Sequence, residues 1–377
     1  SKAPLIYRAT PQWFISMQKN DLRKKAIKAI NDTAFYPSKG KDRLLSMVEG
    51  RPDWCVSRQR VWGVPLPIFI NKNTKEPLRD QKVIDRIASI YEKQGSDCWF
   101  TDDPKVFLGD KYSPNDFEKL SDIVEVWFDS GSTHSFVLEK RKDLKWPADM
   151  YLEGSDQHRG WFHSSLLESC GTRGKAPFES ILSHGFVVDG KGMKMSKSMG
   201  NVISPDDILK NYGADILRVW VAASDYAEDL RIDKSILTQH AESYRKIRNT
   251  FRFMLGNLKD NYEKQNFEKL NLSELDELEQ FILHKIFHIS TSVEKNLKNY
   301  NFHRLYKELL NFCTLDLSSF YFDIRKDVLY CDSLNSKKRK NCVKVLNVIL
   351  ESLLKWFAPI LVFTTDEIYS LINKDEK

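Results

Sequence analysis

The chain has 377 residues, of which 41% are apolar and 29% are charged, and this balance excludes a wholly disordered protein. The formal net charge of +6 permits a nucleic-acid partner without demanding one. None of the six cysteines forms a Cys-x-x-Cys pair, so we expect free thiols, a cytoplasmic protein and no protein-bound zinc or other metal site. The uncharged run 356–365 is too short to cross a bilayer, and we expect no membrane partner.

Up to about residue 235, short apolar runs alternate with Gly and Pro, which is typical of an α/β fold. Residues 149–153 are predicted to form a short buried strand, followed by a turn and a helix that starts near Trp161. The run 181–188 is predicted to be the next parallel strand. The stretch from about 72 to 122 is polar, and we expect it to be an irregular insertion on the sheet.

Beyond residue 235 the composition changes, since Gly256 and Pro359 are the only glycine and proline there. Apolar residues recur with helical spacing, and this predicts an antiparallel helical bundle. The expected helices cover 235–258, 275–298, 302–322, 340–357 and 359–372. The fold class is therefore α/β followed by all-α.

In the stretch 189–201, which reads DGKGMKMSKSMGN, Lys194 and Lys197 lie three residues apart with glycines on both sides. Glycines let backbone amides approach an anion closely, and lysines neutralise charge that develops on a phosphate. The pattern predicts a mobile cationic loop that binds a nucleoside triphosphate. A basic surface loop without such a ligand is the alternative.

Five of these residues match, letter for letter, the KMSKS signature of class I aminoacyl-tRNA synthetases: Lys194, Met195, Ser196, Lys197 and Ser198. Six further blocks, in order, resemble the bacterial isoleucyl branch of this family: 51–67 (RPDWCVSRQRVWGVPLP), 126–134 (VWFDSGSTH), 151–162 (YLEGSDQHRGWF), 184–188 (HGFVV), 213–219 (GADILRV) and 244–258 (YRKIRNTFRFMLGNL). The resemblance covers nearly the whole chain. Valine or methionine specificity is the alternative within the same class.

The resemblance implies the second half of a class I nucleotide-binding, Rossmann-like fold, followed by a helical bundle. Residues 1–50 are expected to be a segment that returns from an absent editing domain, and 51–189 to be the C-terminal half of the catalytic domain. A connector that bears the KMSKS motif is expected over 190–234, and a helical anticodon-binding domain over 235–377.

The resemblance also assigns site residues. Trp127, Gln157 and Trp161 are expected to line the pocket for the isoleucine side chain, because flat aromatic walls enclose a branched aliphatic group. Plain core packing is the alternative for both tryptophans. Contacts to the aminoacyl-adenylate are expected from Glu153, Gly154, Asp156 and Gln157, and a place near the adenine from His184, Gly185 and Phe186.

Lys194 and Lys197 are the expected catalytic residues, steadying the phosphates of ATP, and Mg²⁺ is expected to arrive with those phosphates. Asp129 is expected to be a buried carboxylate that is tied to nearby backbone amides.

The expected partners are L-isoleucine, ATP and tRNA(Ile), and the parent protein is expected to be monomeric. Arg245, Arg248 and Arg252 share one helical face, which could follow RNA phosphates. A solvated face with pairing to neighbours such as Glu242 is the alternative.

The second class I signature, H-x-G-H, does not occur among these residues, since no two of the eight histidines have that spacing. In the resembling family this motif lies in an N-terminal half. We therefore expect the chain to be a fragment that lacks its N-terminal half, and the alternative function is a tRNA-binding piece that is catalytically inactive alone.

Overall fold

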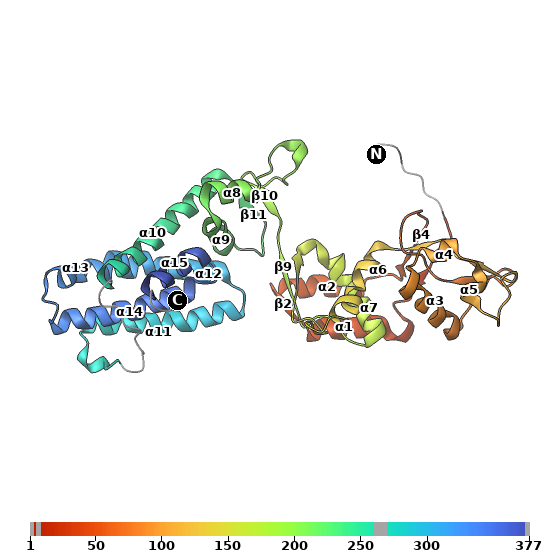
Figure 1. The fold of residues 1–377 in the computed structure, drawn as a ribbon, viewed down its shortest axis with the longest axis horizontal. Helices are drawn as coiled ribbons and strands as arrows, with labels where there is room; N and C mark the ends of the chain where they lie inside the picture. Colours follow the sequence, from red (N-terminus) through yellow and green to blue (C-terminus); the bar gives the residue numbers. More distant parts are fainter. Residues whose placement is uncertain (1–3, 5–8, 259–269, 374–377) are drawn as a thin grey trace. The chain divides into compact units, whose positions relative to one another are not determined.

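The computed structural model describes residues 4, 9–258 and 270–373, and the chain divides into two compact units, 1–183 and 184–377 (Figure 1). The division lies upstream of the change in composition near residue 235. The reason is that helices between 205 and 223 pack against the helices that follow them.

The first unit mixes short strands with helices. In chain order these are β1 (Phe14–Ile15), α1 (Leu22–Asp32), β2 (Ala34–Tyr36), α2 (Lys39–Glu49), β3 (Trp54–Cys55), β4 (Ser57–Arg58), β5 (Phe69–Asn71), α3 (Gln81–Gln94), α4 (Cys98–Thr101), α5 (Pro104–Leu108), β6 (Phe117–Lys119), β7 (Ile123–Val124), α6 (Val126–Gly131), β8 (Tyr151–Gly154), α7 (Trp161–Arg173) and β9 (Ser180–His184). The predicted strand at 149–153 is observed as β8, and the predicted helix from Trp161 as α7.

Three of these strands form one sheet in the order β2-β9-β8. β2 and β9 are parallel, with Ala34 opposite Ser180 and Tyr36 opposite Leu182. α1 packs against both α2 and α7, and Leu22, Ile30 and Leu44 enter the same core as Phe162 and Ile181 (Figure 1). Residues from the predicted 1–50 segment thus help to build the core of the sheet that carries β8.

The prediction of one strand over 181–188 is wrong. β9 ends at His184, and residues 187–189 form a separate strand that pairs elsewhere. The break falls at Gly185, where an added Cβ would lie 2.2 Å from the backbone oxygen of Glu228. The close approach of another backbone segment therefore turns the chain out of the sheet at this glycine.

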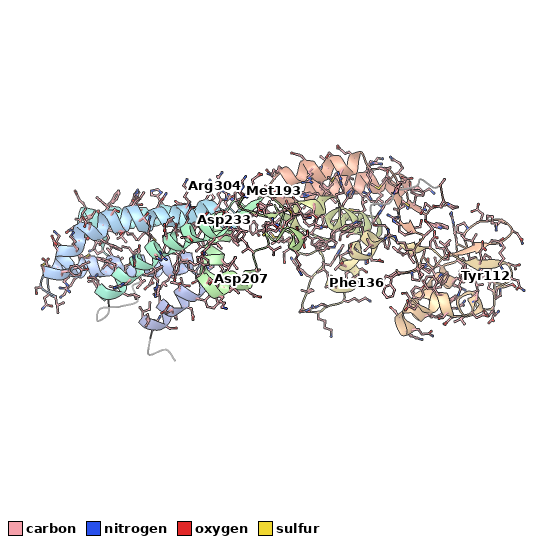
Figure 2. The ribbon with its side chains drawn as sticks, turned by 90° about the horizontal axis from the view of Figure 1, so that it is seen from above. Tyr112, Phe136, Met193, Asp207, Asp233 and Arg304 are labelled. Atoms are coloured by element: carbon pink, nitrogen blue, oxygen red, sulfur yellow. The ribbon has the colours of Figure 1, made fainter. Side chains whose placement is uncertain are left out.

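The expectation of an irregular stretch at 72–122 is also wrong. Residues 69–119 contain α3, α4 and α5 between the paired strands β5 and β6, with a core of their own. Val83 and Ile87 enter this core from one face of α3, and Trp99 is fully buried, with its indole nitrogen donating to the Leu120 carbonyl at 2.8 Å. Tyr112, labelled in Figure 2, donates its hydroxyl to Asp80 at 2.8 Å.

The second unit is mainly helical. In chain order it contains β10 (Val187–Asp189), α8 (Pro205–Tyr212), α9 (Ala214–Ala223), β11 (Leu230–Ile232), α10 (Lys234–Leu258), α11 (Glu277–Lys298), α12 (Phe302–Asn311), α13 (Phe322–Cys331), α14 (Lys337–Phe357) and α15 (Val362–Ile372). The predicted bundle is confirmed. The helix expected over 302–322 is observed as α12 and a π-helical stretch, Phe312–Tyr321, that continues into α13.

α9 joins the motif-bearing segment to the bundle. Asp215 is buried and caps α15, since its carboxylate accepts from the Thr364 amide at 2.8 Å. One turn further along α9, Arg218 donates to the Ile360 carbonyl at 3.0 Å. No helix in the described part of the chain is long and apolar enough to cross a membrane.

Candidate active-site elements

The end of β8 and the turn that follows it hold four of the predicted site residues. Gln157 accepts from the Trp161 amide at 3.0 Å, and so satisfies a donor at the start of α7. The same side chain donates to Asp156 at 3.1 Å, and Glu153 accepts from the Gly154 amide at 3.0 Å. Glu153 and Asp156 are exposed at the end of the strand, where open α/β sheets bind ligands.

Both predicted pocket tryptophans lie next to this turn. Trp161 stacks on Tyr151 with ring centroids 4.0 Å apart and an interplanar angle of 3°, and its indole nitrogen donates to the Ser130 carbonyl at 3.0 Å. Trp127 comes from α6 and is 40% exposed. The exposure of Trp127 argues against plain core packing for that residue.

Gly160 separates Trp127 from Gln157, and the sequence interpretation did not single it out. A Cβ on Gly160 would lie 2.6 Å from Gln157 Oε1 and 2.7 Å from Cη2 of Trp127. Trp127 and Gly160 also line a cavity of about 270 Å³ together with Arg51 and Arg58. The only sequence signal for this role is a glycine immediately before a predicted helix.

α6 is capped by Glu125, whose carboxylate accepts from the Trp127 amide at 3.1 Å. The expectation that Asp129 would bind nearby amides is therefore wrong, because Glu125 takes this role. Asp129 is half-buried, and burial, followed by the neighbouring Glu125, raises its pKa.

Two titratable side chains of α7, Glu168 and His163, are buried. Burial, reinforced by Asp129, raises the pKa of Glu168 to about 9. Burial also lowers the pKa of His163 to about 3, and neither of its ring nitrogens has a hydrogen-bond partner among the described residues. Both side chains are therefore neutral at pH 7 in the folded chain.

In the second unit, the KMSKS loop is held by the residue that ends β10. Asp189 accepts from the amides of Lys191 at 3.0 Å and Met193 at 2.8 Å, and from the Asn201 side chain at 2.9 Å. These hydrogen bonds, with Asn201 the largest contribution, hold the pKa of Asp189 below its ordinary value. The Asp189 carboxylate thus joins the start of the cationic loop to Asn201 at its end. Met193 is exposed on the surface of this loop (Figure 2).

Asn201 also forms hydrogen bonds with two residues of the KMSKS motif. It accepts from the Ser196 amide at 2.9 Å and donates to the Lys194 carbonyl at 3.3 Å. Met195 packs partly buried against a small core that includes Trp220. Lys194 and Lys197 are exposed, and neither forms an ion pair with another described residue.

The residues predicted to lie near the adenine open the second unit. The Gly185 amide donates to the Tyr226 carbonyl, and the Phe186 amide donates to Asp229, each at 2.8 Å. Phe186 is 50% exposed, so its ring is free to take a flat ligand. His184 contacts the carbonyl of Gly185 through Nδ1 at 2.8 Å.

A family model described as tRNA synthetases class I (I, L, M and V) matches residues 2–233. The chain belongs to this family. A second model, the anticodon-binding domain of tRNA ligase, matches residues 279–377. Both matches agree with the family and the fold class that the sequence blocks predicted.

Curated relatives of this family include the isoleucine–tRNA ligases of Pelagibacter ubique and Zymomonas mobilis. The first is 72% identical over the whole chain, and the second is 48% identical over 98% of it. The chain spans 42% and 40% of the length of these two relatives.

Solved structures with a similar fold include Mycobacterium tuberculosis methionyl-tRNA synthetase in complex with methionyl-adenylate. Its TM-score is 0.65 at 16% identity, over 93% of this chain and 60% of that chain. A LeuRS–tRNA–LeuAMS complex of Agrobacterium radiobacter K84 has a TM-score of 0.60 at 18% identity, over 85% of this chain and 40% of that chain. At these identities the likeness concerns the class I fold alone.

The three arginines predicted to bind tRNA lie on α10, between the two matched ranges. Arg245, Arg248 and Arg252 are all exposed, while Ile247 and Phe251 on the other face of the helix are buried. No ion pair joins these arginines to Glu242 or to any other residue that the structure describes. The face therefore carries uncompensated positive charge.

Proposed function

We propose that the protein to which this chain belongs is an isoleucine–tRNA ligase, which activates L-isoleucine with ATP and transfers it to tRNA(Ile). The observation that carries the proposal is the KMSKS loop, with its base held by Asp189 and Asn201 and both motif lysines free of ion pairs among the described residues. The 72% identity to an isoleucine–tRNA ligase supports the choice of amino acid.

The chemistry needs charge stabilisation and positioning, without a covalent enzyme intermediate. A carboxylate oxygen of isoleucine attacks the α-phosphorus of ATP, the bond to the bridging oxygen breaks, and pyrophosphate leaves with the electron pair. In the second step a ribose hydroxyl of the tRNA attacks the carbonyl carbon, loses its proton, and AMP leaves. Lys194 and Lys197 would stabilise the negative charge that builds on the departing phosphates.

The strand-end residues would hold the adenylate while the two steps occur. Exposed carboxylates such as Glu153 and Asp156 accept hydrogen bonds from ribose hydroxyls or from an ammonium group. Trp127 and Trp161 would form the walls around the isoleucine side chain, and Gln157 would fix one edge of that pocket. Phe186 would lie against the adenine, beside Gly185 and His184.

Mg²⁺ would be carried by the triphosphate, because it keeps several waters and binds phosphate oxygens in preference to protein cages. Among residues 4, 9–258 and 270–373, no group of three or more His, Cys, Asp or Glu side chains is placed to hold a metal ion. The contribution of this chain to the triphosphate site would be its lysines and loop amides.

Amino-acid-dependent pyrophosphate exchange tests the proposal on the full-length protein that contains these residues. Isoleucine should support the fastest exchange in a panel with valine, leucine and methionine. Valine should be roughly 150-fold less efficient, which is the known ratio for isoleucyl enzymes as a class. A faster rate with valine or methionine would contradict the isoleucine assignment.

A second candidate concerns the 377-residue chain taken alone, as a tRNA-binding piece without catalysis. The exposed arginine face of α10 favours it. Adenylate formation by the isolated chain would exclude it.

The RNA contact itself is tested by tRNA binding at several salt concentrations. Arg248→Gln should reduce the salt dependence by about one counterion, or roughly 0.7–0.9 in the logarithmic slope. The control is Arg304→Gln, an exposed arginine on α12 that is labelled in Figure 2. Equal slopes for the two variants would remove the α10 face from the RNA interface.

A further inference from the structure

Gly160 lies between the side chains of Gln157 and Trp127. Gln157 Oε1 accepts from the Trp161 amide at 3.0 Å, and moving it would leave a helix N-terminal donor unsatisfied. The backbone of Trp127 is held by Glu125, which accepts from its amide at 3.1 Å. Neither neighbour can withdraw from Gly160 without losing a hydrogen bond or reorienting a ring.

The space at Gly160 is smaller than any side chain requires. A Cβ there would lie 2.6 Å from Gln157 Oε1, and 2.7 Å and 2.9 Å from Cη2 and Cζ3 of Trp127. Real Cβ atoms essentially never come within 3.0 Å of such neighbours, so at least one of them must move.

We propose that Gly160 is a positioning residue that sets the separation of Trp127 and Gln157, and thereby the shape of the amino-acid pocket. The inference rests on the proposed function, because it takes these two side chains as pocket walls. Its ligand is the branched aliphatic side chain of the amino-acid substrate. A shift of the Trp127 ring by the radius of a methyl group would change which side chains fit between the walls.

The test compares Gly160→Ala with Gly171→Ala in the full-length protein. Gly171 lies on the helix that Gly160 precedes, and a Cβ there would meet only Leu22, at an ordinary 3.6 Å. Gly160→Ala should raise the KM for isoleucine by about 10-fold and change the isoleucine-to-valine ratio of kcat/KM. The KM for ATP should stay within about 2-fold, and Gly171→Ala should leave all three quantities unchanged.

A rescue variant separates positioning from a general fault in folding. Trp127→Phe removes the outer ring atoms that approach Gly160 and leaves the contact with Gln157 Oε1. Gly160→Ala should therefore raise the KM for isoleucine less in the Trp127→Phe background than in the wild type. If Gly160→Ala alone does not fold, the double variant should fold and support exchange. A double variant that also fails to fold would overturn the proposal.

Two further results would overturn it. One is an unchanged isoleucine KM and selectivity ratio in a folded Gly160→Ala enzyme. The other is an equal loss from Gly160→Ala in the wild type and in the Trp127→Phe background. If the wild type activates another amino acid instead of isoleucine, the proposed function fails, and the same comparison made with that amino acid still decides the role of Gly160.

Discussion

The predicted amino-acid pocket and the KMSKS loop are built in opposite ways. In the first unit, Trp161 is fixed by a stack on Tyr151 at 4.0 Å and by a hydrogen bond to the Ser130 carbonyl. In the second unit, Lys194 and Lys197 project from the surface, and order in the loop comes from polar contacts of Asp189 and Asn201. Ring stacking contributes to the first arrangement, whereas side-chain hydrogen bonds supply most of the order in the second.

This difference fits the two tasks. Discrimination between aliphatic side chains needs walls that do not move, since a loose pocket accepts several shapes. Charge on a triphosphate is redistributed as pyrophosphate leaves, so the lysines that follow it must be able to move with the loop. We therefore expect substitutions in the first unit to change stability and selectivity together, and substitutions in the loop to change rate with little effect on stability.

The largest effect is expected from Lys197→Ala in the full-length protein. Loss of one preorganised charge should lower kcat for adenylate formation by about 10²–10³-fold, while the KM for isoleucine changes little. Lys191→Ala is the matched control, because Lys191 is an exposed lysine of the same loop outside the KMSKS letters. Equal losses in the two variants would mean that only the total charge of the loop matters.

Trp161→Ala tests the predicted amino-acid pocket in the first unit. It removes a stacked, half-buried ring, so the unfolding free energy of the first unit should fall by about 2–3 kcal/mol, below the range for fully buried aromatics. In exchange assays with the full-length protein, larger amino acids should gain relative to isoleucine. Thermal and urea unfolding of the 377-residue chain measure the stability change.

Trp62→Ala is the control for this variant, because Trp62 is 93% exposed in the same unit. It should leave both stability and selectivity unchanged. A Trp161→Ala protein that kept its amino-acid preference would show that the tryptophan serves packing alone.

Sequence alone was sufficient where the signal is local. The KMSKS residues are a direct letter match, and helical spacing located α10, α11, α14 and α15. These helices could be predicted because each buries one continuous apolar stripe against its neighbours.

Sequence was insufficient where the deciding contact is distant. The pairing of Ala34 with Ser180 joins segments that no periodicity relates. The strand break at Gly185 depends on the approach of Glu228, and the role proposed for Gly160 depends on Trp127. The core at 69–119 was missed because Trp99 and its neighbours are few and lie among charged residues. In each case the structure supplies a neighbour that the sequence pattern does not name.

Asn201→Ala should have a smaller effect than loss of a lysine. It removes the hydrogen bonds that join the two sides of the loop and leaves Lys194 and Lys197 in place. We expect kcat/KM for ATP to fall by about 10-fold, with amide hydrogen exchange faster at Ser196 and the melting temperature nearly unchanged. Asn211→Ala, on an exposed residue of α8, is the control. A large drop in melting temperature would contradict the view that these hydrogen bonds order the loop without stabilising the fold.

The last prediction concerns the pH dependence of stability and the buried carboxyl of Glu168 on α7. The folded-state pKa of Glu168 is about 9, against an ordinary value of 4.5, because of burial and then Asp129, while Arg173 acts in the opposite direction. A raised pKa means that the folded state holds the proton more tightly than the unfolded state. The protonated Glu168 carboxyl therefore makes its full contribution to the free energy of unfolding below pH 4.5. That contribution is lost as the pH rises toward 9.

Glu168→Gln should remove this loss, because an amide occupies the same site without ionising. The melting temperature of the first unit in the 377-residue chain should fall less between about pH 6.5 and pH 9 in Glu168→Gln than in the wild type. This window avoids His163, whose pKa of about 3 in the folded state, against an ordinary 6.5, places its own loss of stability below pH 6.5. Glu92→Gln, at an exposed position on α3, should follow the wild type. If both variants keep the full wild-type pH dependence, Glu168 is not the group that makes this unit sensitive to alkaline pH. Water would then reach the Glu168 carboxyl more readily than its burial indicates.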